Sequence, residues 1–271
     1  MDWGRMSRAE RDASYNNSAA VADSAAHNEK RNTASAALRA AYPGTLDLRY
    51  GPREANCWDL FPADDPAAPC LVFIHGGYWQ RNTRHGFAIV GEGVRAHGWS
   101  VALPGYSLAP AVTLTDIVAE IRAALDWLAA NGAAYGVAGP VILSGWSAGG
   151  HLAAMALDHP LVSAGLAISS VFELGPLRDT YLNQALRLTD EEVATLSPLR
   201  LPPVPKPLAI AYGTAELWPL VEDSRALNRL RAAAHMPGVL LPVAGADHFT
   251  VVDELRRSDG LLTRAALDLA R

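Results

Sequence analysis

The sequence predicts an α/β fold in which a mostly parallel central sheet carries helices on both faces. The first observation is a series of nearly continuous apolar runs of strand length, at residues 71–74, 100–103, 141–143, 166–168 and 208–212. Such runs are typical of strands that are buried on both faces of a parallel sheet. The second observation is that helical patterns separate these runs, and this alternation predicts a layered α/β arrangement.

The segment before these runs differs in composition. Residues 1–43 are polar and rich in Asn and Ala, and we expect a partly helical N-terminal extension that ends at Pro43-Gly44. Residues 46–50 and 57–61 then mix polar with apolar positions on either side of a turn that begins at Gly51-Pro52. This pattern predicts an antiparallel hairpin that is half exposed to water.

Two further segments complete the predicted architecture. Residues 116–130 repeat apolar side chains at helical spacing, with Thr113 as a candidate cap and Asn131-Gly132 as the end of the helix. Residues 171–207 interrupt the alternation, because a capping box from Thr189 to Glu192 opens a short helix and a proline-rich stretch follows it. We expect this segment to form a small lid on a single domain that spans residues 1–271.

Composition excludes several classes of function. The chain has a net charge of −5 and no basic stripe, so nucleic acids and anionic membranes are poor candidate partners. No apolar stretch approaches the ~20 residues that a membrane span needs, and the first residues lack the apolar core of a signal peptide. We therefore expect a soluble, cytoplasmic protein without a membrane partner, and the sequence leaves its oligomeric state open.

Neither a metal nor a cofactor is expected. Cys57 and Cys70 are the two cysteines of the chain, and both are expected to be free, buried thiols beside strands. The sequence contains no Cys/His cluster with metal-ligand spacing. Gly86, Gly91 and Gly93 do not form a G-x-G-x-x-G motif after a strand, and no Walker lysine is present, which argues against a nucleotide site. The expected partner is a small-molecule substrate.

The strongest chemical signal is the pentapeptide Gly145-Trp146-Ser147-Ala148-Gly149. It follows the apolar run 141–143 directly and precedes a helical stretch of small residues. In this strand–turn–helix context the G-x-S-x-G pattern strains the backbone of the serine and exposes its hydroxyl above the sheet. We therefore predict that Ser147 is the nucleophile of a serine hydrolase.

A serine nucleophile needs a base and a group that orients the base. His248 lies late in the chain, in a loop after the strand-like residues 239–243, as the order serine, acid, histidine requires. Glu216 is the first carboxylate after the buried strand 208–212, where α/β enzymes place their sites. It would orient the imidazole and stabilise the imidazolium. Asp223 in a predicted helix, and Asp247 as the expected cap of a helix near Phe249, are the rival acids.

The motif HGGYW at residues 75–79 follows the first buried strand. Its glycines let backbone N–H groups turn inward, toward the position where negative charge develops on a substrate oxygen. We predict that the N–H groups of Gly77, Tyr78 and Ala148 form an oxyanion hole. Ala148 also opens a helix whose N-terminus favours negative charge.

These motifs together resemble the kynurenine formamidase (arylformamidase) branch of the α/β-hydrolases. The resemblance rests on HGGYW at 75–79 and GWSAGGHL at 145–152, and extends to residues 15–21, 46–51 and 246–249, so that it covers nearly the whole chain. It implies an α/β-hydrolase fold with Ser147 as nucleophile, Glu216 as acid and His248 as base. The family commonly has Asp at the acid position, so Glu216 is a departure, although it is still a carboxylate.

The resemblance also implies the reaction, which is hydrolysis of an N-formyl arylamine. N-formyl-kynurenine is the substrate of the family, and its products are kynurenine and formate. Such a reaction needs a small acyl pocket beside the serine and a flat slot for the aryl group. Arg81 and Arg84 are candidates to meet the carboxylate of an amino-acid substrate. The aromatic residues that flank the predicted catalytic positions, and that we expect to line the slot, are Tyr78, Trp79, Trp146, Trp218 and Phe249.

Two other functions share the same motifs. A general carboxylesterase with a preference for short acyl groups would use the same Ser147, Glu216 and His248. A non-catalytic binding protein on this fold would be expected to have lost one of these three residues, and all three are present. A comparison of turnover on N-formyl-kynurenine and on 4-nitrophenyl acetate separates the amidase from the esterase.

Overall fold

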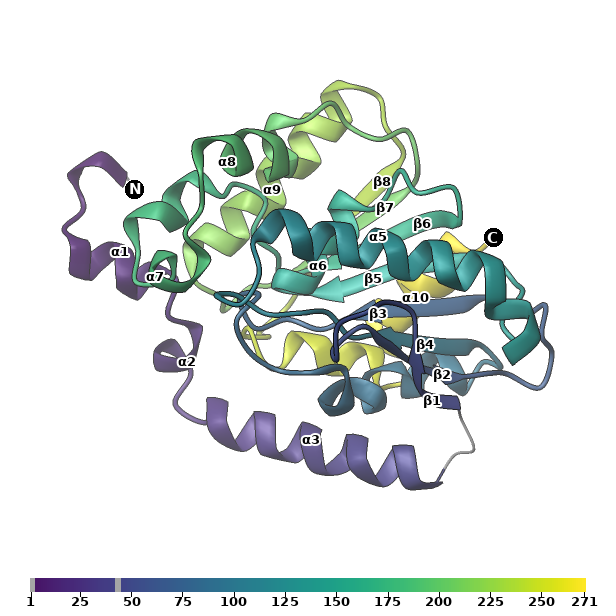
Figure 1. Cartoon of the computed structure of the whole chain (residues 1–271). Helices are drawn as coiled ribbons and strands as arrows, with labels where there is room; N and C mark the ends of the chain where they lie inside the picture. The colour runs from purple at the N-terminus through teal and green to yellow at the C-terminus, as the bar shows by residue number, and fades with distance from the viewer. Residues whose placement is uncertain (1–2, 42–44) are drawn as a thin grey trace.

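A computed structural model describes residues 3–41 and 45–271, and an eight-stranded sheet forms its centre (Figure 1). The strands lie in the order β1-β2-β4-β3-β5-β6-β7-β8. Strands β3 to β8 are parallel, whereas β2 is antiparallel to both β1 and β4. The mostly parallel sheet is therefore confirmed. The strands are β1 (Thr45–Arg49), β2 (Cys57–Phe61), β3 (Cys70–Ile74), β4 (Ser100–Pro104), β5 (Val141–Trp146), β6 (Val162–Ile168), β7 (Leu208–Gly213) and β8 (Gly238–Val243).

Helices cover both faces of this sheet and explain why its strands are apolar at successive positions. Val72 of β3 belongs to the core under α5 (Leu114–Asn131), α6 (Ala148–Met155) and α9 (Trp218–Ala233). Its neighbours Leu71 and Phe73 belong to the core on the opposite face, with α3 (Ser24–Ala41), α4 (Glu92–Arg95) and α10 (Leu261–Leu269). Because side chains alternate along a strand, two buried faces require an unbroken apolar run.

The hairpin differs from its prediction in one respect. Strand β1 keeps a partly exposed pattern, but every residue of β2 is buried. The reason is its position: β2 lies inside the sheet between β1 and β4, and its residues Trp58 and Phe61 contribute to the cores on opposite faces. The mixture of polar and apolar residues in this segment therefore predicted more exposure than β2 has. Its polar residue, Asp59, is buried with ionic partners.

Local capping signals were accurate. The Thr113 side chain accepts from the Asp116 N–H, and the Asp116 carboxylate accepts from the Thr113 N–H, which starts α5 as a capping box. Thr189 and Glu192 do the same for α8 (Asp190–Leu196). Cys57 and Cys70 are free and buried, as expected. No helix in the described parts of the chain is long and apolar enough to cross a membrane.

Residues 171–207 leave the sheet and contact the N-terminal helices. They contain the short helices α7 (Asn183–Leu186) and α8, and α7 lies near α1 (Arg8–Ser14) in Figure 1. The Trp3 indole donates to Asp179, and the Tyr181 N–H donates to Asp12 at 2.7 Å. This segment therefore packs against the N-terminal extension, which continues through α2 (Asn17–Ala20) into α3.

A buried ionic cluster fastens α3 and the loop after β3 to the sheet. Asp59 of β2 accepts from Arg84 Nε at 3.1 Å, and Arg39 Nε of α3 lies 3.1 Å from its other oxygen. Arg84 also pairs with Asp47, whose own N–H donates to Asp59 at 3.1 Å. The Asp59 side chain has no exposed surface and that of Arg84 is 7% exposed, so these charges compensate one another away from solvent.

We predict that Asp59→Ala destabilises the protein by about 3–5 kcal/mol, because it removes the buried partner of the Arg84 guanidinium and leaves only the exposed Asp47. Urea unfolding followed by circular dichroism measures this change. Asp158→Ala is the matched control, since Asp158 pairs with Arg122 at the surface, and it should cost less than about 1 kcal/mol. Equal losses for the two variants would contradict a structural role for the buried cluster.

A second prediction concerns His151 of α6, which is fully buried and lies 2.7 Å through Nε2 from the carbonyl oxygen of Leu196. Burial lowers the pKa of His151 to about 4, whereas a histidine in an unfolded chain titrates near ~6.5. Between these values the unfolded state binds more protons, so the stability contributed by the neutral ring is lost as the pH falls.

The His151→Gln variant lacks this proton uptake. The unfolding free energy of the wild type should therefore exceed that of His151→Gln by about 2 kcal/mol more at about pH 7.5 than at about pH 5. Chemical denaturation of both proteins at the two pH values tests this. A difference that stays constant across this range would show that His151 is not held neutral by the fold.

Candidate active site

The structure brings Ser147, Glu216 and His248 together at the carboxyl edge of the sheet. Ser147 Oγ lies 3.2 Å from His248 Nε2, and His248 Nδ1 lies 2.8 Å from Glu216 Oε2. The three residues follow β5, β7 and β8, whose carboxyl ends lie along one edge of the sheet in the order β5-β6-β7-β8. A hydroxyl, an imidazole and a carboxylate in this line form the arrangement that activates a serine for attack.

Ser147 occupies a strained turn between β5 and α6. Its backbone has φ +58° and ψ −121°, a region that residues with a side chain rarely adopt. Two glycines make this turn feasible. A Cβ on Gly149 would lie 2.0 Å from the carbonyl oxygen of Ile74, and a Cβ on Gly145 would lie 2.2 Å from that of Gly149. The G-x-S-x-G pattern thus lets α6 begin directly against the end of β3.

Glu216 is held in place by hydrogen bonds to its other oxygen. Oε1 accepts from the Gly213 N–H at 2.7 Å and from the Ser169 hydroxyl, while Oε2 faces His248. The Glu216 side chain has no exposed surface. Its position is therefore set by β6 and β7, and the imidazole meets a carboxylate that is already oriented.

The two rival carboxylates serve other partners. Asp223 Oδ2 accepts from the N–H groups of Phe172 and Glu173 at 2.6 and 3.0 Å, and burial raises the pKa of Asp223 to about 7. Asp247 Oδ1 accepts from the Phe249 and Thr250 N–H groups at 2.8 and 2.9 Å, which closes the turn around His248. The expected helix near Phe249 begins instead at Val251, as a short 3₁₀ helix with Thr250 at its cap position, so Asp247 holds the turn before the helix rather than capping it. The neighbour of His248 Nδ1 is Glu216.

The three predicted oxyanion donors have free N–H groups. Among the described residues, the N–H groups of Gly77, Tyr78 and Ala148 donate to no backbone carbonyl outside regular helices and strands. Ala148 is the first residue of α6, where an N–H has no partner within the helix. Gly77 and Tyr78 have φ values of +123° and +51°, which reverse the chain direction after β3. These positions suit the binding of an oxyanion.

His75 supports this loop and is held neutral. Its ring stacks on Tyr106 at 4.2 Å between centroids, and its Nδ1 lies 3.0 Å from the Gly76 carbonyl oxygen. Burial lowers the pKa of His75 to about 4, so the ring is uncharged near neutral pH and Nδ1–H can donate to Gly76. His75 therefore fixes the carbonyl side of the loop whose N–H groups face the site.

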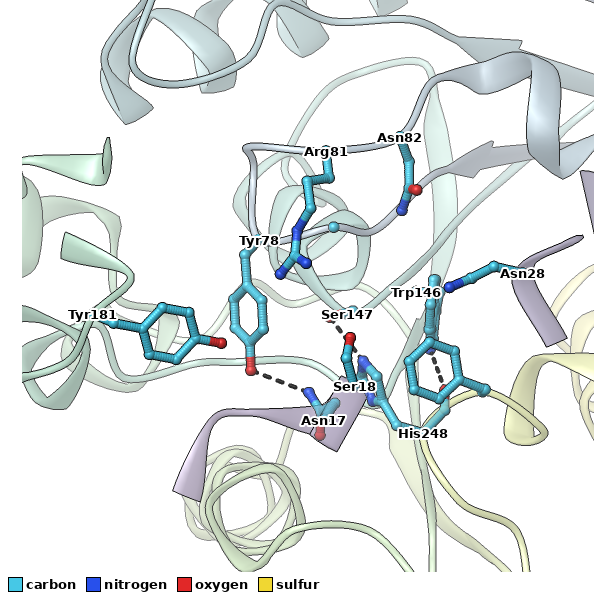
Figure 2. Close-up of a pocket in the computed structure, with 12 residues that line it drawn as sticks. Asn17, Ser18, Asn28, Tyr78, Arg81, Asn82, Trp146, Ser147, Tyr181 and His248 are labelled. Atoms are coloured by element: carbon cyan, nitrogen blue, oxygen red, sulfur yellow. Dashed lines mark hydrogen bonds between the residues drawn. The ribbon is translucent and has the colours of Figure 1, made fainter. Parts of the chain in front are cut away.

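The N-terminal extension fixes the other side of the loop through Tyr78. The Tyr78 hydroxyl donates to the Tyr15 carbonyl oxygen at 2.8 Å and accepts from Asn17 Nδ2 at 3.1 Å (Figure 2). Since the phenolic proton is used on Tyr15, the Asn17 atom that faces Tyr78 must be the donor. Tyr78 is 4% exposed, so this contact is buried.

Trp146 fixes the loop that carries His248. Its indole Nε1 donates to the His248 carbonyl oxygen at 2.8 Å, and the two rings lie 4.9 Å apart. Phe249 lies against the same indole at 6.0 Å between centroids. Trp146 thus positions the histidine that faces its neighbour Ser147.

A cavity of about 90 Å³ adjoins Ser147 (Figure 2). Of the aromatic residues expected to contact substrate, it is lined by Tyr78, Trp146 and Phe249. Trp79 and Trp218 lie elsewhere. Trp79 is fully buried with its ring 5.0 Å from His151, and Trp218 packs 6.5 Å from Trp3. The sequence could not separate these two from the others, because nearness in sequence to a motif does not fix the direction of a side chain.

Six further lining residues were not predicted as site residues, although the sequence offered Arg81 as a possible carboxylate contact. Three of the six come from the N-terminal extension and one from the 171–207 segment, so distant parts of the chain contribute to the lining of the cavity. For Asn17 and Ser18, the signal in the sequence is the stretch at 15–21 that resembles the family. That resemblance does not indicate that the stretch lies at the site. The six are Asn17, Ser18, Asn28, Arg81, Asn82 and Tyr181.

One group of side chains in the described residues has the spacing of metal ligands. Ligand atoms of Asp47, Asp59 and His85 lie within 4.8 Å of one another. Arg84 and Arg39 already lie against these carboxylates, so their charges are compensated without a cation. We interpret this group as the ionic cluster that fastens the fold.

Comparisons with known proteins agree with this geometry. The BD-FAE family model matches residues 60–159, which include the HGGYW and GWSAG motifs. Kynurenine formamidase of Danio rerio is 24% identical over 99% of this chain and 98% of its own length. Esterase LipC of Mycobacterium tuberculosis is 26% identical over 76% of this chain and 60% of its own length.

Solved structures show the same architecture. A protein from Silicibacter sp., provisionally named a thioesterase, has a TM-score of 0.83 at 26% identity and covers 94% of this chain and 98% of its own. Esterase B from Lactobacillus rhamnosis has a TM-score of 0.72 at 20% identity over 93% of this chain and 96% of its own. The predicted fold and the predicted resemblance are thereby confirmed. The chain has the α/β-hydrolase fold and is a serine hydrolase of amidase or esterase type, similar along its whole length to a kynurenine formamidase.

Proposed function

We propose that this protein hydrolyses N-formyl arylamines, with N-formyl-kynurenine as the model substrate, through a formyl-enzyme on Ser147. The observation that carries this proposal is the line from Ser147 Oγ through His248 to Glu216, with distances of 3.2 and 2.8 Å. The similarity to the kynurenine formamidase of Danio rerio over 99% of the chain supports the formamide as the scissile group.

In the proposed reaction, Ser147 Oγ attacks the formyl carbon while His248 Nε2 takes the hydroxyl proton. The N–H groups of Gly77, Tyr78 and Ala148 bind the oxyanion of the tetrahedral intermediate. Glu216 stabilises the imidazolium and remains ionised throughout. The proton on His248 then passes to the arylamine nitrogen as the C–N bond breaks. A water molecule, deprotonated by His248, attacks the formyl-enzyme and releases formate.

The shape of the site suits a small acyl group. A cavity of about 90 Å³ has room for a formyl or acetyl group beside the serine. Trp146 and Phe249 provide flat apolar surface beside it for an aromatic leaving group. We also propose that the protein acts in the cytoplasm, where its two buried cysteines would stay reduced.

The alternative is a carboxylesterase that acts on short-acyl esters. It would use the same three side chains, and the similarity to esterase LipC and to the fold of esterase B supports it. The two functions differ in the leaving group, because an amide nitrogen needs the proton from His248 more than an ester oxygen does.

A paired assay tests the proposal. The protein should hydrolyse N-formyl-kynurenine with a kcat/KM at least comparable to that on 4-nitrophenyl acetate. Ser147→Ala should lower kcat by ~10³-fold or more on both substrates while the unfolding transition stays unchanged. Ser163→Ala is the control and should leave kcat unchanged, since Ser163 is an exposed serine on β6 that does not line the cavity. Turnover of the ester without turnover of the formamide would favour the carboxylesterase.

A second variant pair tests the proposed acid. Glu216→Gln should reduce kcat by roughly 10³–10⁴-fold, because a neutral amide neither stabilises the imidazolium nor selects its tautomer. The rival carboxylate provides the control: Asp223→Asn keeps an acceptor for the Phe172 and Glu173 N–H groups and should stay within about three-fold of wild-type kcat. A larger loss in Asp223→Asn than in Glu216→Gln would reverse the assignment.

A further inference from the structure

The walls of the cavity beside Ser147 carry positive charge without a carboxylate. Among the described residues that line this cavity, Arg81 carries a permanent charge, and none is Asp or Glu. The carboxylate of Glu216 lies behind His248 and already accepts from Gly213 and Ser169. A substrate therefore meets hydrogen-bond donors and a cation at the mouth of this cavity.

Arg81 and Arg84 follow the same loop but have different surroundings. Arg84 is buried and pairs with Asp59 and Asp47. Arg81 is exposed and lies within 4.0 Å of no carboxylate in the described residues, so its charge is available to a ligand. Figure 2 shows its guanidinium directed from the loop toward the space beside Tyr78.

Tyr181 lines the same cavity as Arg81. Figure 2 shows its hydroxyl directed toward Tyr78, which also lines the cavity. The Tyr181 N–H is anchored on Asp12 of α1 at 2.7 Å. The 171–207 segment and the N-terminal extension thus fix one side of the space that the Arg81 head group occupies.

A second guanidinium, that of Arg31, lies against Trp146, another residue that lines the cavity. Arg31 of α3 is 4% exposed and has no ion pair in the described residues; its group lies over the Trp146 ring at 5.3 Å. Burial lowers the pKa of Arg31 to about 10, so it remains a cation near neutral pH. Its Nη2 donates to Asn28 Oδ1 at 2.7 Å, which leaves the Asn28 amide NH₂ for the cavity. Figure 2 shows the Asn28 nitrogen directed toward Trp146.

From this distribution of charge we propose that Arg81 is the specificity-determining residue for an anionic leaving group. Its guanidinium binds a carboxylate on the arylamine or phenol that leaves, while the acyl carbon lies at Ser147. The preferred substrates are then acylated aromatic amines or phenols that carry a carboxylate. A guanidinium suits this task because it binds both carboxylate oxygens at once. The inference relies on the proposed function for the position of the scissile bond.

The experiment uses two pairs of substrates, each differing in one group. N-formyl-kynurenine is compared with its carboxamide, and 3-acetoxybenzoate with 3-acetoxybenzamide. Arg81→Gln should lower kcat/KM about 10- to 100-fold on each carboxylate, chiefly through KM, and less than about two-fold on each carboxamide. Arg81→Lys should recover part of the loss, because it restores the charge but not the planar fork. Arg229→Gln, an exposed position on α9, is the control and should change neither.

The outcomes separate the two proposals. If the ester pair shows the loss on the carboxylate while neither formamide is hydrolysed, the formamidase proposal fails and the role of Arg81 stands. If formamides are hydrolysed but Arg81→Gln affects carboxylate and carboxamide equally, Arg81 does not select charge and the inference is overturned. Wild-type protein that shows no preference for the carboxylate member of either pair would also overturn it.

Discussion

The close approach of helix α6 to the end of β3 is the constraint on which the rest of the site depends. A side chain on Gly149 would collide with the Ile74 carbonyl, so glycine at this position lets the helix begin there. At the same turn Ser147 has a positive φ, and the Ala148 N–H, as the first of α6, has no helical partner. One packing constraint between a strand and a helix therefore presents both the hydroxyl and one of the proposed oxyanion donors.

The second half of the site is positioned by segments that surround the loop after β3. His75 binds the Gly76 carbonyl from the sheet side, and Tyr78 is tied to Tyr15 and Asn17 from the N-terminal side. Tyr78 and Trp79 both have positive φ values, a conformation that costs non-glycine residues free energy and persists only when neighbouring contacts determine it. The N-terminal extension thus contributes to the geometry of the loop as well as to the lining of the cavity.

Burial affects the charge of the histidines and the arginine near the cavity differently. His75 and His151 are neutral because they are enclosed, whereas Arg31 remains charged because a guanidinium is difficult to deprotonate even when it is buried. The described residues that line the cavity offer a cation and amide donors but no carboxylate, and the Glu216 carboxylate behind His248 is occupied by His248 and the end of β7. This distribution of charge is the basis of the proposed preference for substrates with negative charge at the end opposite the acyl group.

The sequence by itself determined what depends on neighbours along the chain. Apolar runs predicted the buried parallel strands, and the pairs Thr113/Asp116 and Thr189/Glu192 predicted two helix starts. The G-x-S-x-G motif predicted the turn at Ser147. Its glycines are required because a Cβ on Gly145 would meet the backbone of Gly149, and a Cβ on Gly149 would meet the end of β3. The order of Ser147, Glu216 and His248 along the chain matched the fold, because each follows a strand that ends at the same edge of the sheet.

The tertiary structure decided which side chains share a space, because that depends on how distant segments pack. Trp79 packs against His151 and Trp218 against Trp3, although each lies within two residues of a predicted site residue, as Trp146 does. Asn17 and Asn28 reach the cavity because the N-terminal helices cross its mouth. Arg81 and Arg84 are indistinguishable by sequence, and the buried carboxylate of Asp59 on a strand inside the sheet holds one of them and leaves the other facing the site.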